Sequence, residues 1–218
     1  MVICFDLDGT ILDTFDLIKA TFVEVFERFY PKHKPTDADL KKYFGPTLVE
    51  TFRDVGCSEE EVKMMYDNYK IINARLQPSL IKAYPGVEDL LKRLKQKGYK
   101  LSIFSNKTNN VIKSGLDEVG LTSYFDLILG YNEVERPKPD RCGLDRMREY
   151  FNDEVIYVGD SPSDILTALN ANAIAIGVSQ AVVSEDEFKK AGAHYVIKEI
   201  CELDKLLEEI NVWYFNYR

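Results

Sequence analysis

The chain has 218 residues, of which 45% are hydrophobic and 29% are charged, and its formal net charge at pH 7 is -8. This composition predicts a soluble folded protein with room for one larger domain, or for one domain that carries a smaller insert. The negative charge argues against general binding to nucleic acid or to an anionic membrane, so any site for an anion must be local.

The four cysteines lie far apart without a Cys-x-x-Cys pair, and the two histidines are isolated. This spacing argues against a zinc site and against a disulfide framework. The sequence opens on a short apolar run with no basic segment before a long apolar stretch, and no run reaches the length of a membrane span. We therefore expect a cytoplasmic protein.

The first predicted element is an apolar strand over residues 1–5, which stops at Asp6. Such a run is typical of a buried parallel strand whose carboxyl end carries the side chains of a site. From residue 84 onward helices alternate with strands, which predicts a doubly wound parallel sheet of the α/β class. The aromatic run 213–215 is expected to pack against the body or a partner. The later strands are predicted over residues 100–104, 127–129, 155–158, 173–178 and 195–197, and the helices over residues 87–97, 108–120, 143–151, 185–191 and 202–210.

Between these parts lies a long helical block with no good strand before about residue 100. A capping-box pattern at Ser58 opens its most regular helix, over about residues 59–76. We expect about four helices here, forming a small all-helical domain over residues 15–80. This domain is inserted after the first strand of an α/β core domain that comprises residues 1–14 and 81–218.

Polar residues follow several predicted strands, and the tips of parallel strands face one edge of a sheet. This would bring together the three carboxylates of Asp6, Asp8 and Asp160, which is costly unless a cation neutralises them. Magnesium, a hard cation that prefers oxygen ligands, is the natural choice. The polar residues at these tips are Asp6 and Asp8, Ser105 and Asn106, Lys138 in a loop, and Asp160 with Asp164.

Four motifs follow one another along the chain, namely Asp-Leu-Asp-Gly-Thr from Asp6, Ser-Asn from Ser105, the loop Lys138, and Gly-Asp-Ser-x-x-Asp from Gly159. In this order they resemble the haloacid dehalogenase (HAD) superfamily. The helical block after the first motif resembles the mobile helical cap of that superfamily. The resemblance covers essentially the whole chain. Alone, each motif would be weak, and the segment from Asp160 could simply begin a helix. Together they imply a HAD-like core with a helical cap and a phosphatase that uses Mg²⁺.

The resemblance implies that Asp6 attacks phosphorus and forms an aspartyl-phosphate. Asp8 would protonate the leaving oxygen and later take a proton from water. Lys138 would offset the negative charge of Asp6 and of the phosphoryl oxygens. The main-chain carbonyl of Asp8 would also bind the metal, and Asp164 would either bind it or orient its waters. The implied substrate-binding residues are Thr10, Ser105 and the amide of Asn106, and the implied metal ligands are Asp6, Asp8, Asp160 and Asp164.

The loop lysine has an alternative. In the family pattern the loop usually reads Lys-Pro-x-Pro, but Lys138 lacks the second proline, whereas Arg136 begins an Arg-Pro-x-Pro run. A guanidinium can also clamp phosphate. We prefer Lys138, because the preceding residues 132–135 fit the family better in that register.

Asp8 separates two chemistries of the superfamily. The dehalogenases lack this second aspartate, so its presence points to phosphate esters or anhydrides. Residues 45–52 look like the cap segment of phosphoglycolate phosphatases and related pyrophosphatases. We therefore expect a small phosphorylated substrate such as 2-phosphoglycolate, with inorganic pyrophosphate as an alternative. A β-phosphoglucomutase-like phosphomutase is a second alternative, and a non-catalytic protein that kept the fold is the least favoured.

Overall fold

The computed structural model describes residues 1–216, with the side chains of residues 1–210. The chain divides into two compact units, which we call the core unit (Met1–Leu12 with Ala83–Arg218) and the helical unit (Asp13–Lys82). The aromatic run 213–215 lies outside the described side chains, so its packing stays a prediction. In the described part of the chain, no helix is both long and apolar enough to cross a membrane.

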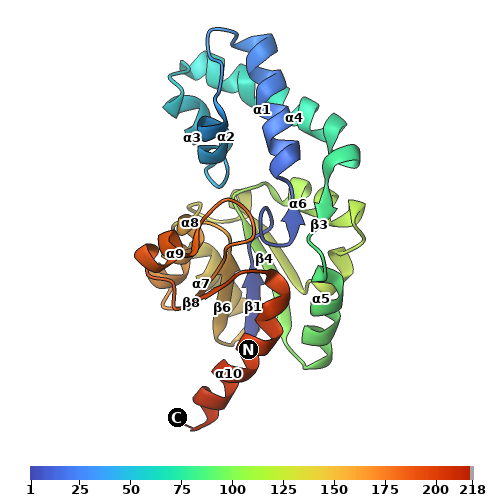
Figure 1. Ribbon diagram of the computed structural model, residues 1–218, viewed down its shortest axis with the longest axis vertical. Coiled ribbons are helices and arrows are strands. Elements are labelled where there is room, and N and C mark those ends of the chain that lie inside the picture. The colour runs from blue at the N-terminus through green and yellow to red at the C-terminus, as the bar shows by residue number, and fades with distance from the viewer. Residues whose placement is uncertain (217–218) are drawn as a thin grey trace. The chain divides into compact units, whose positions relative to one another are not determined.

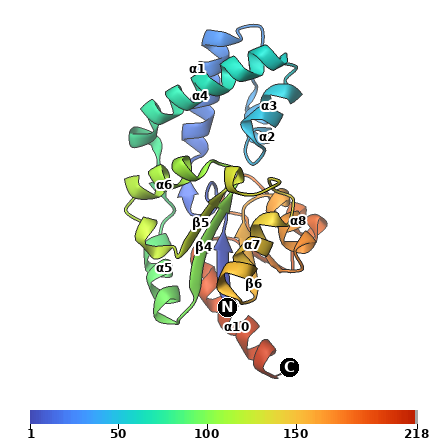
Figure 2. The ribbon, with the colours of Figure 1, turned by 180° about the vertical axis from the view of Figure 1, so that it is seen from behind.

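The core unit is built on a six-stranded sheet in the order β5-β4-β1-β6-β7-β8, and every neighbouring pair is parallel (Figures 1 and 2). All four residues of β1 are buried, as expected of a central strand with a continuous apolar run. In the register of the sheet, Phe5 lies between Ile103 and Val158. The predicted doubly wound parallel sheet is therefore confirmed. Its strands are β1 (Val2–Phe5), β4 (Lys100–Ser105), β5 (Leu127–Gly130), β6 (Val155–Gly159), β7 (Ile174–Val178) and β8 (Tyr195–Ile197).

Helices cover both faces of this sheet. On one face α7, α8 and α9 share a buried core with Cys4, Phe104 and Tyr157. On the other face, α5 packs on β4, and α5 and α10 contact each other. Helix α10 lies in front of the sheet in Figure 1 and behind it in Figure 2. Helix α6 lies beside the edge strand β5. These helices are α5 (Val87–Gln96), α6 (Asn109–Glu118), α7 (Cys142–Phe151), α8 (Pro162–Asn170), α9 (Glu185–Ala191) and α10 (Leu203–Asn216).

The helical unit has a hydrophobic core of its own, in which Phe22 contacts the rings of Phe52 and Tyr69. A capping box begins three of its helices, and the one at Ser58 was predicted from the sequence. The helix after Ser58 continues to Leu80, four residues beyond its predicted end. The helices of this unit are α1 (Phe15–Phe29), α2 (Asp37–Lys42), α3 (Leu48–Asp54) and α4 (Glu59–Leu80).

Two features of the fold differ from the predicted elements. No strand was expected between residues 5 and 100, but β2 (Leu12–Asp13) and β3 (Lys82–Ala83) form a two-stranded sheet where the chain passes between the units. Strands of two residues are too short to show an alternating pattern. The predicted helices also omit α8, although the segment from Asp160 was recognised as a possible helix start.

Candidate active site

The carboxyl ends of three neighbouring strands bring the predicted motifs together. Asp6 directly follows β1, Ser105 ends β4, and Asp160 directly follows β6. Because β1 pairs with both β4 and β6, Asp6 is flanked on either side by a motif residue. All three residues are buried.

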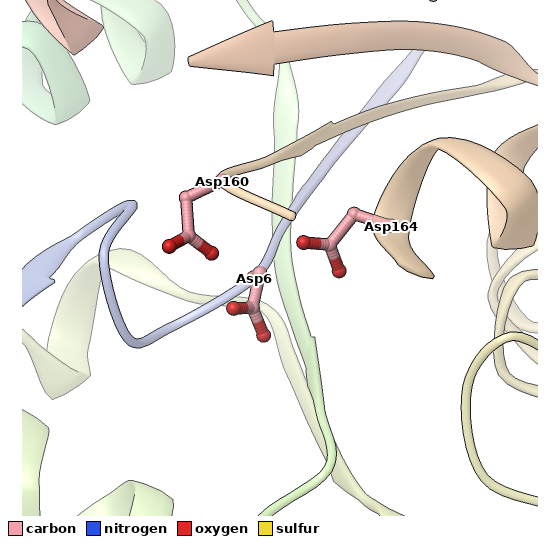
Figure 3. A group of neighbouring side chains, drawn as sticks. All are labelled: Asp6, Asp160 and Asp164. Carbon is pink, nitrogen blue, oxygen red and sulfur yellow. The ribbon is translucent and has the colours of Figure 1, made fainter. Parts of the chain in front are cut away.

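Asp6, Asp160 and Asp164 form a cluster of buried carboxylates. Each offers one oxygen, and these oxygens lie within 4.8 Å of one another. Figure 3 shows the side chains of Asp6 and Asp160 extending from the ends of their strands, and that of Asp164 from the beginning of α8. The Oδ2 atom of Asp160 is buried and has no hydrogen-bond partner among the described residues. A buried carboxylate oxygen without a donor fits a hard divalent cation such as Mg²⁺, which would satisfy it.

Lys138 is the cation next to this cluster. Its Nζ donates to Oδ1 of Asp6 and to Oδ1 of Asp164, each at 2.7 Å. The side chain of Lys138 is 4% exposed, whereas that of Arg136 is 59% exposed and pairs with Asp140. The structure therefore places Lys138, and not Arg136, beside Asp6.

The main chain of Lys138 is fixed by Asn106. The Oδ1 atom of Asn106 accepts the N–H of Lys138 at 2.9 Å, and its Nδ2 donates to the carbonyl oxygen of Lys138 at 3.4 Å. The amide of Asn106 was expected to help to bind a phosphoryl group. In the structure its side-chain amide contacts the main chain of Lys138 through Oδ1 and Nδ2, so that it positions the lysine, and its expected role toward a phosphoryl group stays a prediction.

Asp164 belongs both to the cluster and to the start of α8. Its Oδ2 accepts from the N–H and the hydroxyl of Ser161, at 3.0 and 2.6 Å, which completes a capping box. Its Oδ1 accepts from Lys138 and, at 3.2 Å, from the hydroxyl of Tyr157. A Cβ atom on Gly159 would lie only 2.3 Å from the side chain of Asp164, so this close approach requires glycine. The motif therefore begins a helix and also contributes Asp164 to the carboxylate cluster, and its role in a catalytic site stays a prediction.

The electrostatics of the cluster follow from its burial. Burial raises the pKa of Asp6 to about 7, and the carboxylates of Asp164 and Asp8 add to the rise while Lys138 opposes it. Burial, together with Asp6 and Asp164, holds the pKa of Asp160 well above its usual range. For Lys138, burial lowers the pKa, but the two neighbouring carboxylates outweigh it and keep the pKa above its usual value. An additional positive charge would favour the ionised form of both acids.

Asp8 lies outside the carboxylate cluster and binds a different cation. The Nζ atom of Lys107 donates to Oδ1 of Asp8 at 2.7 Å. The main-chain N–H of Lys107 donates to Oγ of Ser105 at 3.4 Å. Lys107 directly follows the Ser-Asn motif, but its spacing from Asp8 in the sequence gave no signal of this contact.

Thr10 is fully buried, and its Oγ1 has no hydrogen-bond partner among the described residues. The turn around it is closed by a hydrogen bond of 2.8 Å from the N–H of Gly9 to the carbonyl of Leu12. Gln180, two residues after β7, donates from Nε2 to the carbonyls of Gly9 and Thr10 at 3.1 and 2.9 Å. Sequence reasoning missed Gln180, because it belongs to no motif.

Residues 3–178 match the family model of haloacid dehalogenase-like hydrolases. The chain belongs to this family. It is 32% identical over 203 residues to the pyrophosphatase PpaX of Listeria monocytogenes, an alignment that covers 91% of this chain and 92% of the relative. Among solved structures, a haloacid dehalogenase-like hydrolase from Bacteroides fragilis superposes with a TM-score of 0.86 at 28% identity, over 93% of this chain and 98% of that chain. A structure described as a phosphoglycolate phosphatase from Lactobacillus delbrueckii subsp. bulgaricus gives 0.83 at 28% identity, over 94% and 97% of the two chains.

Membership of the haloacid dehalogenase-like family confirms the resemblance that the motifs indicated. The relative by sequence from Listeria monocytogenes is named a pyrophosphatase, and one of the structural neighbours is described as a phosphatase. This hydrolase is therefore placed among the phosphatases of its family. Of the residues that the sequence motifs singled out, Asp6, Ser105 and Asp160 lie at the carboxyl ends of central strands, and Lys138 contacts Asp6 from a loop.

Proposed function

We propose that this hydrolase is a Mg²⁺-dependent phosphatase that transfers a phosphoryl group from a small substrate to Asp6 and then to water. One observation carries the proposal. A buried Asp6 is held at 2.7 Å by Lys138 and clusters with Asp160, whose Oδ2 has no partner among the described residues. Asp6 is a carboxylate at the end of a strand, and it is fixed next to a cation and to a carboxylate without a full set of partners. Such a carboxylate is suited to nucleophilic attack on phosphorus.

In the proposed reaction a carboxylate oxygen of Asp6 attacks phosphorus, the bond from phosphorus to the leaving oxygen breaks, and Asp8 gives that oxygen a proton. Water then attacks the phosphorus of the aspartyl-phosphate, Asp8 takes its proton, and Asp6 leaves as a free carboxylate. Lys138 offsets charge on Asp6 and on the phosphoryl oxygens, and Ser105 and Thr10 supply hydroxyls near the phosphoryl group.

Asp6, Asp160 and the main-chain carbonyl of Asp8 would hold the metal, with Asp164 as a further ligand or as a partner of its waters. When bound, Mg²⁺ would neutralise the clustered carboxylates and stabilise charge on the transferring oxygens. The fit rests on the charge of the cluster and on the open oxygen of Asp160.

Two observations support a proposal for the substrate. The cap segment over residues 45–52 and the phosphoglycolate phosphatase among the structural neighbours favour a small monoester such as 2-phosphoglycolate. The sequence relatives named pyrophosphatase favour inorganic pyrophosphate. Both are small anions, and we propose the monoester first with pyrophosphate as the alternative. A cytoplasmic location is part of the proposal and rests on the sequence alone.

The test is release of phosphate from a panel that includes 2-phosphoglycolate, pyrophosphate, sugar phosphates and nucleoside monophosphates, with Mg²⁺ and then with excess EDTA. We expect magnesium-dependent release concentrated on one compound, and a loss of at least about a thousandfold in Asp6→Asn. Asp8→Ala should still accumulate some phosphorylated Asp6, which mass spectrometry would detect. Full activity in Asp6→Asn would disprove the mechanism.

A further inference from the structure

We propose that Lys107 binds a second anionic group on the leaving part of the substrate, and so selects substrates that carry one. This inference rests on the proposed function, because it assumes that the leaving oxygen is released next to Asp8. It names the substrate class more closely: small phosphate compounds with a carboxylate or a second phosphate close to the leaving oxygen.

The first observation is the contact between Lys107 and Asp8. Its Nζ lies 2.7 Å from Oδ1 of Asp8, in a pair whose side chains are 22% and 15% exposed. An ammonium group has three donors and no acceptor, so contact with one carboxylate oxygen leaves donors for an anion. Lys138, in contrast, is 4% exposed and divides its Nζ between two carboxylates. Of these two lysines, Lys107 is the one that solvent and a substrate can reach.

The second observation is that the backbone of Lys107 is fixed. Its carbonyl accepts the N–H of Tyr131 at 3.0 Å, and its own N–H donates to Ser105. A Cβ atom on Gly130 would lie 2.6 Å from the carbonyl oxygen of Lys107, so the glycine allows this close approach. A held main chain fixes the root of the Lys107 side chain, so the ammonium group stays within one side-chain length of this point while it contacts Asp8.

The distance between Lys107 and the leaving oxygen follows from the role of Asp8. A general acid must come within hydrogen-bond distance of the leaving oxygen, about 3 Å. With 2.7 Å from Asp8 to Nζ of Lys107, the leaving oxygen lies within about 6 Å of that ammonium when the same carboxylate oxygen is used. A charged group one or two bonds beyond the leaving oxygen can therefore contact Lys107. Pyrophosphate has a phosphate there and 2-phosphoglycolate has a carboxylate, whereas a simple alkyl phosphate has neither.

The experiment compares 2-phosphoglycolate with ethyl phosphate, which has the same skeleton without the carboxylate. We expect Lys107→Met to lower the ratio of their kcat/KM values about tenfold, because 2-phosphoglycolate loses one charge-assisted contact and its KM rises. Any effect that reaches both substrates through Asp8 cancels in this ratio. Lys107→Arg should retain most of the ratio, and Lys113→Met, at an exposed lysine on α6, should leave it unchanged.

A binding measurement separates this inference from the proposed reaction. In the Asp6→Asn protein, calorimetry should show that 2-phosphoglycolate binds more tightly than ethyl phosphate, and that adding Lys107→Met removes the difference. This result can be obtained even if no compound is hydrolysed, in which case the proposed function fails while the anion site stands. An equal fall for both compounds, or an unchanged preference in Lys107→Met, would overturn the inference and leave Lys107 only a partner of Asp8.

Discussion

Two lysines and four carboxylates set the charge at the carboxyl ends of β1, β4 and β6. Lys138 is buried between two of the carboxylates, and Lys107 is partly exposed beside a third. If all of these groups are ionised, two negative charges remain, which is the charge that one Mg²⁺ neutralises. The carboxylates in this balance are Asp6, Asp8, Asp160 and Asp164. Single substitutions here should therefore act through charge more than through packing.

The first prediction concerns the metal-free protein and pH. Because the pKa of Asp6 is raised from 3.8 to about 7, the folded state holds this proton more tightly than the unfolded chain does. The corresponding stability is complete below about pH 4 and is lost as the pH rises toward 7. Asp6→Asn cannot ionise, so in EDTA at pH 8 it should be more stable than the parent, on the order of 2 kcal/mol.

Urea unfolding at pH 4.5 and pH 8 measures this effect, and the difference between the proteins should shrink at the lower pH. Asp54→Asn, at an exposed position of α3, is the control and should show no such trend. A variant Asp6→Asn that is less stable than the parent at pH 8 would show that the pair with Lys138 outweighs burial.

The second prediction distinguishes the two candidate cations of the loop. Lys138→Met would leave Asp6 and Asp164 buried without their shared partner, so we expect a loss of about 3 to 5 kcal/mol in stability and loss of activity. Arg136→Met removes an exposed pair with Asp140 and should change the stability far less than Lys138→Met does. Thermal unfolding and phosphate release measure both. A larger effect in the arginine variant would contradict the placement of Lys138.

At the scale of elements, the predictable part of the site follows from local patterns. The apolar runs that become β1, β4 and β6 each end at a polar motif, so both the strands and the residues at their tips could be predicted from the sequence. The partners of those residues could not. Lys107 and Gln180 lie 99 and 170 or more residues from the groups that they contact, and only the order of the strands brings them together. For the same reason, the sequence did not indicate that the side chain of Asn106 would hold Lys138.

The third prediction tests how the loop after β7 supports the loop after β1. Gln180 donates two hydrogen bonds to the Gly9 and Thr10 carbonyls, and its Oε1 accepts the N–H of Ile200 at 2.9 Å. In Gln180→Glu a carboxylate oxygen would face two carbonyl oxygens, so we expect a cost of about 1 to 3 kcal/mol. The turn beside Asp8 should also loosen, with a fall of about tenfold in kcat.

Gln96→Glu, at the exposed end of α5, makes the same chemical change without these contacts. Gln180→Ala removes the donors without adding a charge and should lie between the parent and Gln180→Glu in both unfolding and kcat. Identical behaviour of Gln180→Glu and Gln96→Glu would show that the two loops do not depend on this amide.

At the scale of the whole molecule, each unit has its own hydrophobic core. The core of the helical unit lies around Phe22, which contacts four other aromatic rings of that unit. In the core unit, α7, α8 and α9 pack on the sheet, and Phe188 is fully buried there. Because the two sets of buried residues are separate, a cavity in one unit should weaken that unit first.

The fourth prediction concerns a cavity in the hydrophobic core of each unit. Phe22→Ala should destabilise the helical unit by about 3 to 5 kcal/mol. In hydrogen exchange, the amides of α1 and α4 should then lose protection while those of β1 and β6 keep theirs. Phe188→Ala is the matched variant in the core unit and should give the opposite pattern. Equal loss of protection in both units from either variant would show that they unfold together.

The central place of β1 has a consequence for biosynthesis. This strand is translated before both of its partners, which begin at residues 100 and 155. The helical unit is a compact unit with a hydrophobic core of its own, so it can fold on the ribosome while β1 has no partner strand. At about 5 to 20 residues per second, the strand that leads into Asp6 stays unpaired on both sides for some five seconds or more, and on one side until β6 emerges. A nascent chain stalled before residue 155 would therefore display an apolar strand, Val2–Phe5, open to chaperones and to aggregation.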